Sequence, residues 1–107
     1  MKIVKYIQEN WETLPKSSFN DMQIVIFKET DNYDGGWGHH SYGGYGVNEQ
    51  GELCWCYSSG CSCCGSSSVD SNTEKTLKMF TLDEGSIEDV EPESVNFAGL
   101  VVSYSDY

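Results

Sequence analysis

The apolar residues of this chain fall into short runs of two different periodicities, which limits the fold to short helices and strands around one small core. In residues 2–14 the apolar side chains recur at helical spacing, and Pro15 ends the pattern. The members of this stripe are Ile3, Val4, Ile7, Trp11 and Leu14. Residues 22–29 are instead rich in β-branched and aromatic side chains. They predict an inner strand after the first helix.

A turn signal at residues 48–51 separates two further β-rich runs. Residues 45–47 precede this turn and residues 52–57 follow it, which predicts a β-hairpin. The preceding segment, residues 31–46, combines many glycines with aromatic side chains. It predicts a loop that runs into a strand near Tyr42.

The second half of the chain carries fewer apolar residues. Residues 58–72 are almost entirely serine, glycine and cysteine, which predicts a loop. The threonine and phenylalanine content of residues 75–82 favours a strand. A short helix capped by Asn72 or Thr73 is the alternative. Residues 97–104 predict a final strand.

Together these elements predict an α+β fold, in which a small antiparallel β-sheet carries an N-terminal helix on one face and a Cys-rich hairpin loop. The 107 residues predict a single domain over residues 1–107. A chain of this size buries roughly two-thirds of the surface that it exposes when unfolded. Aromatic residues make up 13% of it, so we expect an aromatic core. The candidates are Trp11, Phe19, Phe27, Trp55, Phe80 and Phe97.

Charge sets the class of partner. The chain has 17 acidic residues, 6 lysines and no arginine, for a net charge of -11. Because arginine is the usual reader of phosphate and guanine, the sequence predicts neither direct binding of nucleic acid nor binding of an anionic membrane. A protein partner with a basic surface is expected instead. The N-terminus does not resemble a signal peptide, and we expect a cytoplasmic protein.

Five cysteines within residues 54–64 leave three interpretations open. The first is a zinc site, since zinc takes four nitrogen or sulfur ligands. Its candidate ligands are Cys54, Cys56, Cys61 and Cys63, with Cys64 as an alternative to Cys63 and His39 or His40 in reserve. The second is a thiol redox couple, with a disulfide such as Cys61–Cys64 or Cys54–Cys63. The third is that Cys54 and Cys56, on one face of a strand, pack as small apolar side chains.

Residues 55–63 run from an aromatic strand into the turn Gly60-Cys61-Ser62-Cys63. This run resembles a signature of small uncharacterised proteins of bacteriophages and prophages. In those proteins a proline-containing stretch commonly follows, where this chain has Cys64 and Gly65, and Cys54 and Cys56 are additional here. The resemblance implies a phage-like origin and no particular activity.

The glycine- and aromatic-rich segment between residues 35 and 46 has two interpretations. Exposed tryptophan and tyrosine are typical anchors of protein interfaces, which favours a recognition loop. Its candidate contacts are Trp37, His39, His40, Tyr42 and Tyr45. In the alternative, Tyr42 and Tyr45 cover glycines of neighbouring strands. No catalytic arrangement of the two histidines can be located in the sequence.

The acidic segment over residues 83–94 is either a solvated linker or a mimic of nucleic-acid charge. Its carboxylates are Asp83, Glu84, Glu88, Asp89, Glu91 and Glu93. The leading hypothesis is a non-enzymatic, phage-like binding protein that occludes a host protein, for example one that handles nucleic acid or serves in defence. No cofactor is expected under it. A zinc-binding structural domain and a thiol redox protein are the alternatives.

Overall fold

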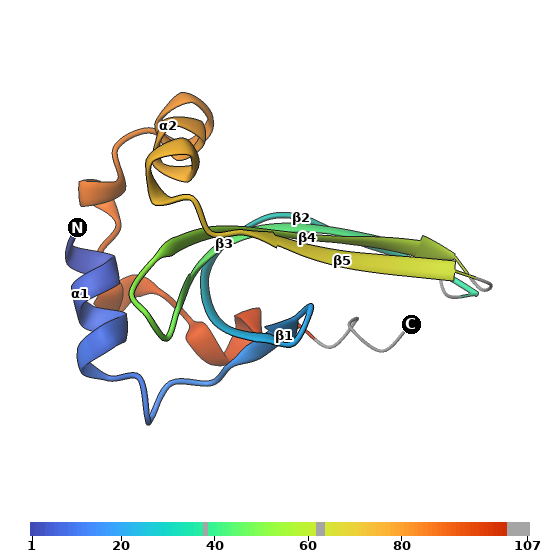
Figure 1. Ribbon diagram of the computed structural model, residues 1–107, viewed down its shortest axis with the longest axis horizontal. Helices are drawn as coiled ribbons and strands as arrows, with labels where there is room; N and C mark the ends of the chain where they lie inside the picture. The colour runs from blue at the N-terminus through green and yellow to red at the C-terminus, as the bar shows by residue number, and fades with distance from the viewer. Residues whose placement is uncertain (38, 62–63, 103–107) are drawn as a thin grey trace.

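The five strands of the sheet follow one another in space in the order of the sequence, and each pair of neighbours is antiparallel. The structure is a computed structural model that describes residues 1–37, 39–61 and 64–102 (Figure 1). Its elements are α1 Lys2–Glu9, β1 Ser17–Phe19, β2 Met22–Gly36, β3 His39–Asn48, β4 Leu53–Cys61, β5 Cys64–Asp70, α2 Thr73–Glu84, and the short 3-10 helices η1 Ile87–Asp89, η2 Pro92–Ser94 and η3 Phe97–Leu100. The predicted α+β fold is confirmed.

The predicted hairpin around residues 48–51 is confirmed, but its strands are much longer than expected. β2 continues to Gly36 and β3 begins at His39, so most of the expected loop over residues 31–46 is strand. Aromatic rings contribute to this, because they cover two glycines of β3. A Cβ atom on Gly43 would meet the Trp55 ring, and one on Gly44 would meet the Tyr42 side chain.

The expected loop over residues 58–72 is also largely wrong. β4 extends to Cys61, and β5 forms a regular ladder with it from Cys64 to Asp70. The low apolar content of this segment does not prevent strand formation. Backbone hydrogen bonds hold an antiparallel ladder together, and its outer part needs no apolar face.

A helix forms over Thr73–Glu84, where the sequence favoured a strand over residues 75–82. The capping alternative was therefore the right one. The Asn72 side chain accepts a hydrogen bond from the backbone N–H of Lys75 at 3.1 Å. Thr76 and Phe80, one helical turn apart, are both buried, so the helix has a face for the core. The cap and this face outweigh the strand preference of threonine and phenylalanine.

Replacing Asn72 by alanine is expected to lower the free energy of unfolding by about 1 kcal/mol, since the first turn of α2 loses its side-chain acceptor. Urea unfolding followed by far-UV circular dichroism measures the change. Gln50→Ala, in the exposed β3–β4 turn, is the control and should change stability by less than about 0.5 kcal/mol. Equal stability of Asn72→Ala and wild type would contradict the role of the cap.

Both ends of the chain differ from expectation. The first helix ends at Glu9 instead of residue 14, and the Asn10 side chain donates a hydrogen bond to the Tyr6 carbonyl at 2.9 Å. The sequence did not predict β1. The expected strand over residues 97–104 is wrong in its described part, because Phe97–Leu100 is a 3-10 turn in which Asn96 accepts from the Gly99 N–H at 3.3 Å. Residues 103–107 lie outside the described part of the chain.

The sheet carries a packed cluster on each face. On one face the two α-helices and η1 cover β2, β3 and β4, and the buried members are Ile3, Val4, Ile7, Val25, Phe27, Tyr45, Val47, Leu53, Phe80 and Ile87. On the other face β1 and the segment after η3 cover the same strands, and the buried members are Phe19, Ile24, Ile26, Tyr42, Cys54, Cys56 and Val102. Along each strand, neighbouring residues therefore alternate between two cores.

The sheet extends well beyond the helices (Figure 1). This outer part, called the arm below, consists of residues 31–36, 39–43, 57–61 and 64–68, which lie opposite one another in the strand register. The pairs Gly36–His39 and Cys61–Cys64 are at its end. No helix in the described part of the chain has the length and apolar character needed to cross a bilayer.

Candidate functional site

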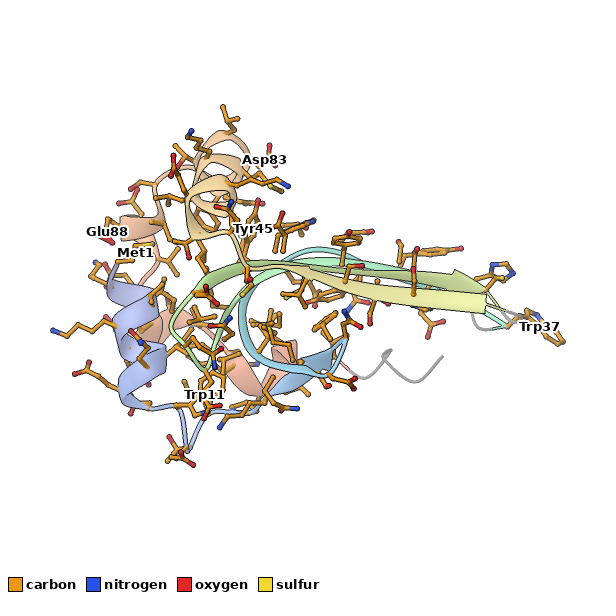
Figure 2. The ribbon with its side chains drawn as sticks, viewed as in Figure 1. Met1, Trp11, Trp37, Tyr45, Asp83 and Glu88 are labelled. Atoms are coloured by element: carbon orange, nitrogen blue, oxygen red, sulfur yellow. The ribbon has the colours of Figure 1, made fainter. Side chains whose placement is uncertain are left out.

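Trp37 is at the end of the arm and is the most exposed large apolar side chain among those described, with 87% of its surface accessible (Figure 2). It occupies the turn between β2 and β3 with a positive φ of 56°, next to Gly36 with φ 79°. The Asp34 carboxylate accepts a hydrogen bond from the Gly36 N–H at 3.0 Å and so holds the turn. The turn presents a tryptophan in a left-handed conformation that bulky residues rarely adopt.

Two exposed tyrosines share one face of the arm. Tyr33 lies opposite Ser41 in the register and is 58% exposed, and Tyr57 lies opposite Gly43 and is 47% exposed. Residues opposite one another point to the same face, and so do residues two apart in a strand. Tyr33, Tyr57 and the exposed His39 therefore belong to the face that carries Tyr45 further in. This face and Trp37 form an aromatic surface without a cover among the described residues.

The structure corrects the assignment of the other three loop residues to a recognition surface. His40 is buried, and its Nε2 lies 2.9 Å from the Ser58 Oγ. Tyr42 is buried with its ring 5.8 Å from that of Phe19. Tyr45 is buried in the opposite core. Strand alternation turns His40 and Tyr42 away from the face that carries His39. Tyr45 shares the face of His39 but lies further in, where Phe80 of α2 packs against its ring.

The structure does not bring the proposed zinc ligands together. Cys54 and Cys56 are completely buried in an apolar cluster. Cys61 is five residues beyond Cys56 and seven beyond Cys54 in the same strand, about 17 and about 23 Å away at the usual rise, and it is on the opposite face. Cys63 lies outside the described residues. Among the residues described, no three histidine, cysteine or acidic side chains gather as metal ligands do.

Burial also governs the chemistry of the two inner thiols. Desolvation raises the pKa of Cys54 to about 12, and its Sγ donates a hydrogen bond to the Glu52 carbonyl at 3.3 Å. Desolvation likewise raises the pKa of Cys56 well above the ordinary value. Both thiols are therefore protonated at neutral pH, whereas metal binding and nucleophilic chemistry need the thiolate. This matches the interpretation of Cys54 and Cys56 as small apolar side chains.

The acidic segment is exposed, and it folds as the end of α2 followed by short 3-10 turns. Asp83 and Glu84 end α2, and the next four carboxylates lie on η1, on η2 or, for Glu91, at the residue that caps η2. All six are exposed. Three of the six form ion pairs with other residues that the structure describes. Glu84 lies 3.7 Å from Lys28, Glu88 lies 3.6 Å from the N-terminal amine, and Glu91 lies 2.6 Å from Lys2. The hydrogen bond from Lys2 lowers the pKa of Glu91. These ion pairs therefore hold the end of α2 against β2 and the residues after α2 against the N-terminal end of α1.

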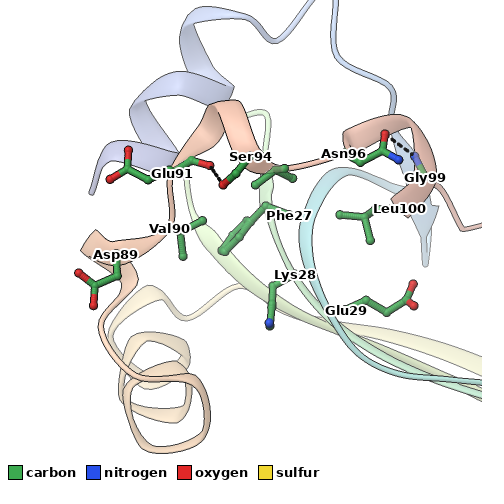
Figure 3. Close-up of a pocket in the computed structure, with 11 residues that line it drawn as sticks. Phe27, Lys28, Glu29, Asp89, Val90, Glu91, Ser94, Asn96, Gly99 and Leu100 are labelled. Carbon is green, nitrogen blue, oxygen red and sulfur yellow. Dashed lines mark hydrogen bonds between the residues drawn. The ribbon is translucent and has the colours of Figure 1, made fainter.

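An open groove of about 470 Å³ separates β2 from the C-terminal 3-10 segment (Figure 3). Its walls are Phe27, Lys28 and Glu29 on one side and residues between Asp89 and Leu100 on the other. The acidic composition of residues 83–94 pointed to the second wall. No sequence signal identified β2 as the first wall of this groove, because the approach of the two segments is a property of the tertiary fold.

No family model, no curated protein and no solved structure matches this chain.

Proposed function

We propose that this chain is a small non-enzymatic binding protein that docks its arm onto a basic partner protein and occludes part of that partner's surface. The observation that supports this most strongly is Trp37, held 87% exposed at the end of the arm. Tryptophan is among the residues that contribute most to binding when a partner covers them. The described residues of this turn, 34–37, are exposed and belong to neither core cluster, which favours a role in contact with a partner.

The charge of the arm supports a basic partner. The arm contains Asp31 and Asp34 and no lysine, within a chain of net charge -11. Complementary charge accelerates association with a basic surface and orients the two proteins. Asp34 contributes directly to the turn that presents Trp37, so the acidic character is next to the proposed anchor.

The phage-like origin remains a proposal, and it makes a host protein that handles nucleic acid or serves in defence the natural target. The run that carries the resemblance ends in this same region. Gly60 lies opposite His40 in the register, and His39 opposite Gly36, so Gly60 and Cys61 are at the same end of the sheet as Trp37.

Capture of a partner from a bacterial host lysate tests the proposal. Immobilised wild type is expected to retain a basic protein at low salt and less of it at high salt, because screening weakens the attraction. Trp37→Ala is expected to weaken binding at least tenfold, about 1.4 kcal/mol, with unchanged stability.

Leu82→Ala is the matched control, since Leu82 is 85% exposed on α2, away from the arm. Its capture should equal that of wild type. The proposal is wrong if no salt-sensitive partner is retained, or if Trp37→Ala and Leu82→Ala bind equally well.

A further inference from the structure

The groove between β2 and the C-terminal segment has an apolar floor and a charged rim. Phe27, Val90, Val95 and Leu100 supply the apolar side chains. Glu29, Asp89 and Glu91 supply carboxylates, and Lys28 is the one cation among the described lining residues. This combination suits an occupant with an apolar body and cationic ends, because long basic side chains lay their methylene stems on apolar surface and keep their charged heads at the rim.

Two charged groups at the rim of the groove already form ion pairs within the chain. Lys2 neutralises Glu91 at 2.6 Å, and Lys28 is 3.7 Å from Glu84, which is outside the groove. Neither Glu29 nor Asp89 has an ion pair in the described part of the chain, although the Asn32 amide donates to Glu29 at 3.2 Å. These two carboxylates are at opposite ends of the groove, with Phe27 and Lys28 between them (Figure 3).

We propose that this groove binds an extended peptide segment of a basic protein, with one cationic side chain at Glu29, one at Asp89 and an apolar side chain over Phe27. The identity of the partner as a basic protein rests on the function proposed above. The groove adds a second contact, on β2 and η1 instead of the arm. It also specifies the pattern of the ligand as cation, apolar residue, cation.

A second copy of this chain is a poor occupant. Two copies would each bring a net charge of -11, and the chain has only 6 lysines and no arginine to offer to the carboxylates. The ligand is not expected to add a strand to β2 either. In its pairing with β3, β2 carries a bulge at Phe27 and another at Thr30, and bulges with charged side chains discourage the addition of a further strand.

Short synthetic peptides test the inference without any natural partner. The probes are acetylated, amidated peptides with two arginines separated by one, two or three residues, one of them leucine. Amide chemical shifts of the labelled protein locate the binding, and a titration gives the affinity. With the best spacing, the largest shifts are expected at Phe27, Lys28 and Val90, and 0.5 M salt should weaken binding.

The double variant Glu29→Gln with Asp89→Asn is expected to weaken peptide binding at least tenfold. Glu12→Gln with Glu49→Gln is the matched control, since it removes the same charge from exposed sites outside the groove. Its affinity should fall less than twofold. Both substituted pairs are exposed or partly exposed, and thermal unfolding checks that each variant folds.

Equal weakening by the two double variants, or shifts spread over all acidic regions, would overturn the inference in favour of unspecific attraction. No saturable binding of any peptide would overturn it as well. Different results would refute the docking of the arm and the binding of a peptide in the groove. Trp37→Ala should leave peptide binding unchanged, and partner capture that needs Trp37 without any peptide binding would refute the groove alone.

Discussion

Replacing Tyr45 by alanine is expected to lower the free energy of unfolding by about 3–5 kcal/mol, the range for truncating a large aromatic side chain in a core. Tyr45 is 1% exposed, and its ring centroid lies 4.9 Å from that of Trp55 and 4.9 Å from that of Phe80. It therefore joins β3 to β4 and to α2. Since a small domain is stable by only about 5–15 kcal/mol, a large share of the variant should be unfolded under mild denaturing conditions. Urea unfolding monitored by tryptophan fluorescence measures the loss.

Tyr57→Ala is the control for Tyr45→Ala. Tyr57 is 47% exposed on the same face of the sheet, so its truncation should lower stability by less than about 1 kcal/mol. The comparison separates the loss of packing from any general effect of removing a tyrosine from the sheet. If the two variants unfold at similar urea concentrations, the aromatic cluster around Tyr45 does not hold α2 to the sheet.

Cys54 and Cys56 are expected to resist alkylation in the folded protein. With its pKa raised to about 12 from 9.0, Cys54 has about 10³-fold less thiolate near pH 8 than an ordinary cysteine. Its complete burial slows the reaction further. Iodoacetamide treatment of the native and urea-unfolded protein, followed by peptide mass spectrometry, gives the rate at each cysteine. Rapid native modification of Cys54 or Cys56 would contradict the buried, protonated state.

The same pKa shift makes stability depend on pH in a defined direction. Above about pH 9 the unfolded chain loses the Cys54 proton, while the folded chain keeps it to about pH 12. The folded state then binds more protons, so stability falls as pH rises through this window, by up to about 1.4 kcal/mol per pH unit for one thiol. The contribution is fully present below pH 9. Cys54→Ala should flatten the decline between pH 8.5 and 10, and an unchanged slope would contradict the shift.

The sequence was most informative where side chains repeat with one clear period. The apolar stripe of residues 2–14 located α1, although Asn10 ends it early by donating to the Tyr6 carbonyl. The alternation of Cys54 and Cys56 with Trp55 correctly placed the two thiols on one face of β4. Both patterns depend on local geometry, so they could be read without the tertiary fold.

Prediction failed where distant segments decide the structure. Gly43 and Gly44 of β3 suggest a loop from the sequence, whereas in the structure the side chains of Trp55 and Tyr42 cover them. The serines of β5 become a strand because β4 pairs with them over seven residues. Of the candidate contacts in this segment, Trp37 and His39 are exposed and the others are buried, a distinction that depends on the strand register. The groove brings Glu29 next to a segment sixty residues away, which local patterns do not reveal.

Because β2 contains bulges, its number of residues is not fixed by its pairing with β3. Its 15 residues face the 10 residues of β3, with interruptions between Ile26 and Lys28, between Glu29 and Asp31, and between Asp34 and Gly36. Removing a residue at an interruption, such as Thr30, leaves the flanking pairs in place, whereas removing one inside β4 reverses the facing of every later side chain. β2 can therefore gain or lose residues at its bulges without changing the rest of its pairing, while β4 must keep its length.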